Sequence, residues 1–507
     1  MRIALLPLDS RPCNWQFPAM IGRIAGAEVA HPDRCDLGDL HTAADTSAVA
    51  AWLEDAAPRA DALVISADML IYGGLVASRK AQVAPGQAEQ QLALIKRIRQ
   101  HRRVPMLIFG TIMRVAPTIS SEAERTPAQD LMRLAWLSSK AQPTSDDLRA
   151  MDEFRERLPS DVVSEYQAAR ELHHAVNLAL RDLGREHDIC VLFYQDDATP
   201  EGPHVQEARA IGGAMPGTDE AGMMAVAWAC NRNQGAAHFQ VEYESESGAE
   251  AISLWEDRPV REVVDLHRAA LCDQLARNGD ANRGHPLLFV HTPSQLQTDL
   301  ANTSVRQTGP RDIAQFVTRV GSALHGERPI GVADVRYCNG ADPELIEAMQ
   351  KRHLLSRLAA YAGWNTSGNS IGTALAHLCA RTIGLGLTGR AAHLEAARAH
   401  YEFLFHRLID DYGYQSVVRP QAKADAERRG ASPLDLGEEA AAIERFVAGQ
   451  LTSLAHELFA NEFDGVPLLP EESDGPRIAG LSSFTVRLPW RRTFEVEVDL
   501  RFSISNK

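Results

Sequence analysis

Eight short apolar runs, separated mostly by helical patterns, constrain the fold of this chain more than any other feature. They are rich in β-branched and aromatic residues, as buried strands are. The runs occupy residues 3–8, 62–67, 106–110, 189–194, 238–243, 287–291, 330–335 and 359–364. Parallel strands need crossover helices between them, so this alternation predicts a parallel sheet. We expect a (β/α)8 TIM-like barrel over residues 1–385, with two doubly wound α/β domains as the alternative.

The pattern changes after residue 385. Residues 391–411 and 437–460 have the helical period, and the tail at 484–504 alternates as antiparallel strands do. We therefore predict a catalytic domain over residues 1–385 and a helical appendix with terminal β strands over 386–507. The appendix carries no recognisable chemical motif, and packing on the first domain or on a second subunit, as in a homo-oligomer, is left open.

The composition excludes several classes of partner. The formal net charge is −15, so the chain lacks the basic surface that nucleic acids and anionic membranes attract. No apolar run is long enough to span a bilayer, and the first strand follows without a secretory signal. The seven cysteines are scattered without a CxxC pair, which favours reduced thiols in a cytoplasmic protein. The phosphate-loop pattern GxxxxGK[ST] and the dinucleotide pattern GxGxxG are both absent from the sequence.

Polar residues gather directly after the predicted strands. In both α/β architectures the carboxyl ends of the strands form the ligand-binding edge. The candidate binding residues at these ends are Asp9, Arg11, Asp68, Arg114, Asp334, Asn339, Asn365 and Asn369. Each has an ordinary structural explanation as a turn former, a helix cap or a partner of a buried charge. Their common position after strands favours a binding site.

The fourth strand is followed by two adjacent acids, Asp196 and Asp197, in the segment Gln-Asp-Asp-Ala-Thr-Pro. Asp is unfavourable in strands, and two neighbouring carboxylates repel each other. Turn formation before Pro200 explains them as well, because Asp and Thr are common there. We predict that this pair is catalytic.

Five motifs together resemble a bacterial family that is catalogued only as a domain of unknown function, number 4127. They are Pro7-Leu-Asp-Ser-Arg-Pro12, Thr111-Ile-Met-Arg114, Gln195-Asp-Asp-Ala-Thr-Pro200, Gly217-Thr-Asp-Glu220 and Gly363-Trp-Asn-Thr-Ser-Gly-Asn369. The resemblance covers nearly the whole chain but implies no activity.

A second resemblance is mechanistic. The acidic pair after the fourth strand is similar to that of retaining β-N-acetylhexosaminidases, which use the substrate's own 2-acetamido group as nucleophile. This resemblance implies that Asp196 orients the acetamido group and that Asp197 is the general acid. It also implies that Trp364 forms an apolar wall under the sugar and that Asn365 donates hydrogen bonds to its hydroxyls.

We therefore expect a cytoplasmic glycoside hydrolase that acts on a small amino-sugar conjugate, N-acetylated or not, without a cofactor. A plain two-carboxylate glycosidase is a variant of this hypothesis. A non-catalytic sugar-binding protein is another alternative, which predicts binding without turnover.

A metal-dependent hydrolase or lyase is the remaining hypothesis, because strand-end carboxylates suit Mg²⁺ or Mn²⁺. Its candidate ligands are Asp9, Asp68, Asp196, Asp197 and Asp334. No HxH or HExxH spacing points to zinc. His173 and His174 fall in a helical pattern, where we expect them at the surface.

Overall fold

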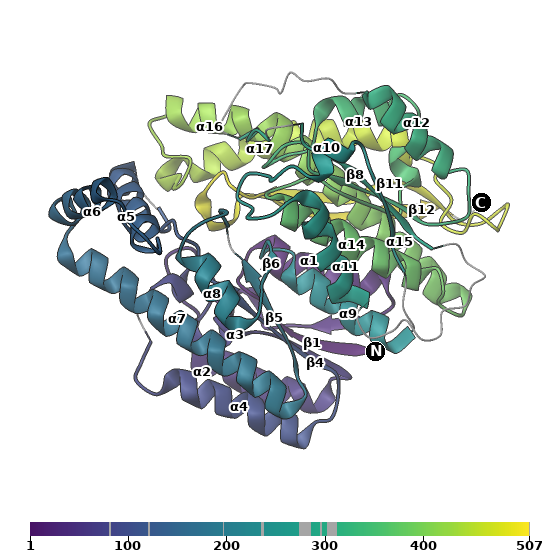
Figure 1. The fold of residues 1–507 in the computed structure, drawn as a ribbon. Helices are drawn as coiled ribbons and strands as arrows, with labels where there is room; N and C mark the ends of the chain where they lie inside the picture. Colours follow the sequence, from purple (N-terminus) through teal and green to yellow (C-terminus); the bar gives the residue numbers. More distant parts are fainter. Residues whose placement is uncertain are drawn as a thin grey trace. The chain divides into compact units, whose positions relative to one another are not determined.

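The computed structural model describes residues 1–80, 83–119, 122–195, 197–234, 238–272, 285–294, 297–301 and 312–505 (Figure 1). The chain forms two compact units. Unit 1 comprises residues 1–15, 29–225 and 255–257, and unit 2 comprises residues 16–28, 226–254 and 258–507. Each unit contains its own parallel sheet.

Unit 1 is built on a six-stranded sheet with the order β2-β1-β3-β4-β5-β6. The strands are β1 (Arg2–Leu6), β2 (Glu28–Ala30), β3 (Ala62–Ser66), β4 (Met106–Ile112), β5 (Cys190–Gln195) and β6 (Met215–Pro216). The four pairings from β1 to β6 are parallel. Because β2 and β3 lie on opposite sides of β1, the strand order reverses at β1, and ligands bind next to such a reversal in open α/β sheets.

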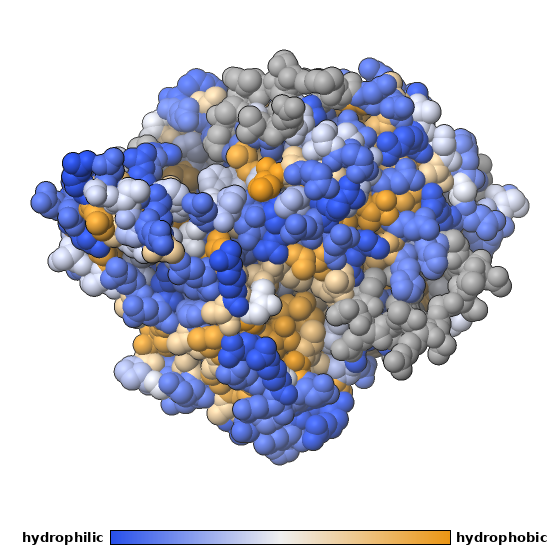
Figure 2. All heavy atoms as spheres, viewed as in Figure 1, coloured by the Kyte–Doolittle hydropathy of each residue, from blue (hydrophilic) through white to orange (hydrophobic). Residues whose placement is uncertain are grey.

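The helices up to residue 234 are α1 (Pro12–Ile24), α2 (Thr46–Ala56), α3 (Ala67–Tyr72), α4 (Gln87–His101), α5 (Arg125–Ser138), α6 (Ser145–Arg157), α7 (Ser160–His187), α8 (Pro203–Ile211) and α9 (Ala221–Gln234). Most residues of α1 and α9 belong to unit 2. Helices α5 and α6 pack together beside one end of α7 (Figure 1). They share a small core of their own, which includes Leu134, Phe154 and Tyr166. A capping box at Thr144 and Asp147 fixes the start of α6. Their visible outer face is mostly hydrophilic (Figure 2).

Unit 2 contains a four-stranded parallel sheet with the order β10-β9-β8-β7. Its strands are β7 (Gln240–Tyr243), β8 (Leu287–His291), β9 (Ile330–Asp334) and β10 (Ala360–Ala362). The tail forms an antiparallel pair, β11 (Arg477–Arg487) and β12 (Glu497–Ser505), as its alternating pattern predicts. Phe289 and Val332 of the parallel sheet share one hydrophobic core with Phe502 of the tail.

The remaining helices are α10 (Glu246–Ala249), α11 (Val260–Cys272), α12 (Ile313–Ala323), α13 (Pro343–Gln350), α14 (Ser367–Gly384), α15 (Arg390–Arg407), α16 (Arg419–Arg428) and α17 (Ala440–Leu458). Two π-helical segments, Leu408–Val418 and Phe459–Phe463, continue α15 and α17. The boundary that we predicted at residue 385 lies within unit 2 and stays a prediction.

The parallel α/β class is confirmed, and each of the eight apolar runs contains a strand. A TIM barrel is not shown, because among the described residues neither parallel sheet closes on itself. The described strands pair into two separate parallel sheets, and the choice between a barrel and two doubly wound domains stays a prediction. Periodicity identifies strands but carries no information on which distant strand each one pairs with.

Candidate functional site

In unit 1, three residues form a buried ion cluster at the carboxyl edge of the sheet, where the strands end. Arg11 Nη2 lies 2.6 Å from both Asp9 Oδ2 and Asp219 Oδ1, and these side chains are at most 6% exposed. Asn14 Nδ2 donates to Asp9 Oδ1 at 3.0 Å. The structure thus brings together two predicted residues, Asp9 and Arg11. We did not predict Asp219 as a site residue, because an acidic residue just before α9 is typical of an ordinary helix start.

The next polar group along this edge is Asp68, in the first turn of α3. It accepts hydrogen bonds from Thr111 Oγ1 at 2.8 Å and from the Thr111 N–H at 2.9 Å, and His173 Nε2 lies 3.1 Å away. Burial alone would raise the pKa of Asp68, but the bonds from His173 and Thr111 outweigh burial and lower it.

Our expectation that His173 lies at the surface was wrong, since it is 2% exposed. Val176 and Leu180, three and seven residues further along α7, are also buried. This spacing places His173 on the apolar face of the helix, so the sequence contained a signal that we missed.

Arg114 and Asp197 form a second ion pair at this edge, with Arg114 Nη1 2.7 Å from Asp197 Oδ2. The two side chains are 20% and 28% exposed, unlike the buried Arg11 cluster. Asp197 has a left-handed backbone with φ of 42°. Non-glycine residues adopt this conformation at a cost and often at functional positions. Asp196 lies outside the described residues.

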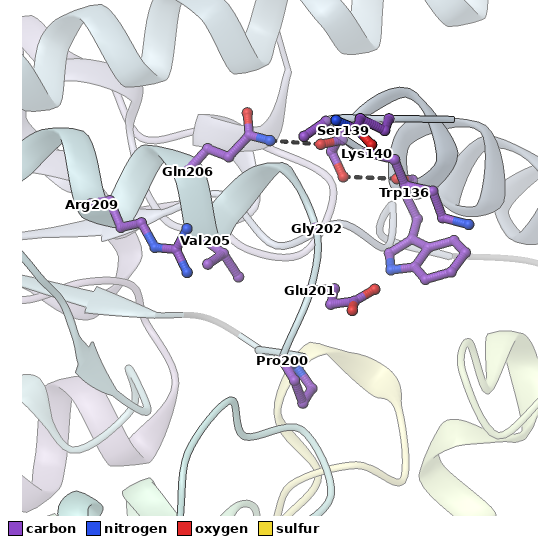
Figure 3. Close-up of a pocket in the computed structure, with 11 residues that line it drawn as sticks. Trp136, Ser139, Lys140, Pro200, Glu201, Gly202, Val205, Gln206 and Arg209 are labelled. Carbon is purple, nitrogen blue, oxygen red and sulfur yellow. Dashed lines mark hydrogen bonds between the residues drawn. The ribbon is translucent and has the colours of Figure 1, made fainter. Parts of the chain in front are cut away.

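A pocket of about 440 Å³ lies beside the loop that carries Asp197. Its lining residues come from α5 and the turn after it, from the β5–α8 loop and from α8: Trp136, Ser139, Lys140, Ala141, Gln142, Pro200, Glu201, Gly202, Val205, Gln206 and Arg209. The Trp136 ring and the Glu201 carboxylate lie on the same side of the pocket (Figure 3). Gln206 Nε2 donates to the Ser139 carbonyl at 2.6 Å and holds α8 to the turn after α5.

The carboxyl edge of the unit 2 sheet carries a different cluster, centred on His291. Its Nδ1 lies 2.8 Å from Glu244 Oε2, and its Nε2 lies 3.0 Å from Asp342 Oδ2. Burial lowers the pKa of His291, but the two carboxylates outweigh burial and raise the pKa to about 10. His291 is therefore a buried imidazolium at neutral pH.

Asp334, at the end of β9, is fully buried beside this histidine. It accepts hydrogen bonds from Tyr361 Oη at 3.1 Å and from the Asp342 N–H at 2.7 Å. Burial, opposed by the charge of His291, raises the pKa of Asp334 to about 6. A carboxyl group that titrates near neutral pH is suited to proton transfer.

A further buried carboxyl, Asp411, comes from the π-helix. It accepts from the Gly363 N–H at 2.8 Å and from Arg407 Nη1 at 3.1 Å, and burial raises its pKa to about 8. Trp364 is 7% exposed, and its ring centre lies 5.7 Å from the Arg407 guanidinium. The predicted wall residue thus packs inside unit 2, next to a buried cation.

The three predicted asparagines of unit 2 have structural roles in loops and at a helix start. Asn339 and Asn365 both have left-handed backbones, and the Asn339 N–H donates to the Asn365 carbonyl at 2.8 Å. Asn tolerates this conformation better than most residues. The Asn369 side chain donates to Thr366 Oγ1 at 2.8 Å, at the start of α14.

The strand-end aspartates do not assemble into a metal site within the described ranges. No group of three His, Cys, Asp or Glu residues there has a geometry that could hold a metal ion. Asp9 is neutralised by Arg11, and the oxygens of Asp68 accept protein hydrogen bonds. These donors do not fit the Mg²⁺ or Mn²⁺ that the alternative hypothesis requires.

No described helix is both long and apolar enough to cross a bilayer.

Comparison with known proteins identifies a family of this chain, but no activity is assigned to that family. A family model described as "Protein of unknown function (DUF4127)" matches residues 3–499. No curated protein and no solved structure matches the chain. The similarity to hexosaminidases therefore stays a prediction.

Proposed function

The chain belongs to this family of unknown function, DUF4127, and we propose that it is a hydrolase that cleaves small sugar conjugates at the carboxyl edge of the unit 1 sheet. One observation carries the proposal. The loop after β5 holds Asp197 in an ion pair with Arg114, and the same loop forms a wall of the adjacent pocket. A closed barrel is not needed, because the site uses the edge of one sheet.

The pocket suits a sugar in size and in chemistry. Its volume of about 440 Å³ falls in the range of small-molecule sites. Trp136 supplies an aromatic surface, while Glu201, Gln142 and Gln206 supply acceptors and donors for hydroxyl groups. An aromatic surface with a few polar groups around it is the usual arrangement of a specific small-molecule pocket.

The ion pair changes the role that we assign to Asp197. A guanidinium 2.7 Å away stabilises the ionised carboxylate, which is the form that balances positive charge developing on a sugar ring. We therefore assign Asp197 to charge stabilisation or to orienting a 2-acetamido group. The general acid is then Asp196 or Glu201, and substitution of each distinguishes them.

The test is a screen of aryl glycosides and amino-sugar conjugates with the unmodified protein and with Asp196→Asn, Asp197→Asn and Glu201→Gln. We expect kcat to fall at least about 100-fold in Asp197→Asn and in one of the other two variants. The general-acid variant should retain more activity on substrates whose leaving group needs no protonation. Asp188→Asn is the matched control, because Asp188 is also an aspartate with positive φ but precedes β5, at the opposite end of the strand.

Unchanged turnover in Asp197→Asn would contradict the proposal, and binding of a sugar without turnover would favour a sugar-binding protein. The proposal includes no metal, so EDTA should leave the activity unchanged. It also includes a cytoplasmic location, which is favoured by seven scattered cysteines without a CxxC pair.

A further inference from the structure

Arg336, in the loop after β9, is a buried cation without the usual partners. The residue is 2% exposed, and its Nε and Nη2 have no hydrogen-bond acceptor within the part of the chain that the structure describes. Its backbone N–H donates to Asp334 Oδ1 at 3.3 Å, which places Arg336 at the carboxyl edge of the unit 2 sheet.

Two of the other buried arginines are hydrogen-bonded to carboxylates, while Arg419 donates to Gln415 Oε1. Arg407 donates to Asp410 and Asp411 in unit 2, and Arg11 donates to two aspartates in unit 1. Burying a guanidinium without such bonds is expensive, because the charge loses its hydration and gains no acceptor. Arg336 thus has unused donors in a position where leaving them unused is costly.

A second segment of the chain lies against the loop that carries Arg336. Segment 297–300 runs along loop 335–338, with Gln297 Nε2 donating to the Val335 carbonyl at 2.8 Å and the Cys338 N–H donating to the Thr298 carbonyl at 3.0 Å. On this segment the buried hydroxyl Thr298 Oγ1 also has no partner among the described residues. Two kinds of donor, a guanidinium and a hydroxyl, therefore occur without acceptors on two adjoining segments.

The geometry points to Arg336 as the anchor of a binding site for a small carboxylate, at the carboxyl edge of the four-stranded sheet in unit 2. A guanidinium offers a planar fork of N–H groups that matches a carboxylate with two parallel hydrogen bonds. This inference does not rest on the proposed hydrolysis, since it concerns other residues in the other unit.

Local charge favours a carboxylate over a phosphate. The charge of Arg336 helps to lower the pKa of Glu244, and His291 lies between the carboxylates of Glu244 and Asp342. Arg336 needs acceptor oxygens for its unused N–H groups. These carboxylates would repel a doubly charged anion more strongly than a singly charged one. A monoanionic carboxylate satisfies the guanidinium and adds the smallest negative charge.

The experiment is a titration of the full chain with pyruvate, lactate, inorganic phosphate and sulfate, followed by calorimetry and by thermal unfolding. We expect the two carboxylates to bind and to raise Tm, and phosphate and sulfate to bind at least tenfold more weakly. Arg336→Gln should lower carboxylate affinity at least tenfold, and Arg336→Lys should recover part of it. Arg328→Gln is the control, because Arg328 lies just before β9, at the opposite end of the strand, and should bind as the unmodified protein does.

A second readout separates a ligand anchor from a structural residue. Without ligand, Arg336→Gln should lower Tm much less than Arg407→Gln does, because Nε and Nη2 of Arg336 have no acceptor among the described residues, whereas Arg407 donates to Asp410 and Asp411. An equal or larger loss of Tm in Arg336→Gln would show that Arg336 stabilises the fold and would overturn the inference. Absence of carboxylate binding, or tighter binding of phosphate than of carboxylates, would overturn it as well.

Discussion

The two parallel sheets of this protein present polar residues at their carboxyl edges in different electrostatic states. In unit 1 the predicted residues Arg11 and Arg114 are each paired with aspartate, and hydrogen bonds lower the pKa of Asp68. In unit 2 burial raises the pKa of Asp334 to about 6, and Nε and Nη2 of Arg336 have no hydrogen-bond acceptor among the described residues. Similar strand-end patterns in the sequence thus produce fixed charges in one unit and titratable groups in the other.

This difference shows which property decides the chemistry of a strand end. A partly exposed aspartate in an ion pair, such as Asp197, can orient a ligand or stabilise positive charge, whereas full burial raises the pKa of Asp411 to about 8 although it accepts from Arg407. A carboxyl group buried without such a partner can exchange a proton near neutral pH. The residue type, aspartate, is the same in the two units. The partners that distant segments contribute decide whether such an aspartate titrates near neutral pH.

The largest expected effect comes from breaking the fixed cluster of unit 1. Arg11→Ala leaves Asp9 and Asp219 buried without their common cation, which should lower the free energy of unfolding by about 3–5 kcal/mol. Urea denaturation measures this change. Arg97→Ala, which removes an exposed pair with Glu54, is the control and should cost at most about 0.5 kcal/mol. Equal costs would show that the Arg11 cluster is not a stabilising unit.

The second prediction concerns the histidine of unit 2. The pKa of His291 in the folded chain is about 10, above its ordinary 6.5, so its stabilisation is complete below pH 6.5 and is lost as pH rises through 10. His291→Gln should therefore destabilise the chain at pH 6, and this cost should shrink by about 4 kcal/mol at pH 10. Denaturation at several pH values measures it, with the exposed His325→Gln as control. A cost independent of pH would contradict the buried imidazolium.

A smaller effect is expected from a comparison of two buried tyrosines, one near the carboxyl edge of each parallel sheet. Tyr361 donates to Asp334, whereas the hydroxyl of Tyr194 has no hydrogen-bond partner within the described ranges. Tyr361→Phe should lower the free energy of unfolding by about 1.5–3 kcal/mol, and Tyr194→Phe should change it by less than about 0.5 kcal/mol. Equal losses in the two variants would remove the contrast that we draw between the edges.

The last prediction concerns the stability of the proposed catalytic residue. Asp197 is 28% exposed, so Asp197→Asn should cost less than about 1 kcal/mol in urea denaturation while hydrolysis is lost. A large loss of stability would show that the Arg114 pair is structural, and the loss of activity would then have another cause.

Much of the local structure could be predicted from the sequence, because buried strands leave apolar runs and the tail alternates with period two. The order of the strands in each sheet could not be predicted, because it depends on contacts between distant segments. The two short strands β2 and β6, of three and two residues, are too brief to leave a pattern.

The sequence could predict where the candidate site residues lie, but not which residues they pair with. Asp9 and Arg11 stand out because they follow a strand, but nothing local indicates that Asp219, about 200 residues away, completes their cluster. The burial of Arg336 could not be predicted from the sequence either, because a charged loop residue is expected in solvent unless the fold is known.

The π-helix Leu408–Val418 makes the chain unusually sensitive to its exact length at this point. A π-helix corresponds to residues inserted into an α-helix, so it persists only while surrounding contacts, here those of Arg407 and Asp411, oppose the return to α geometry. Removing one residue would rotate the side chains that follow by about 100° about the helix axis. Substitutions that keep the length of this segment should be tolerated far better than a single deletion.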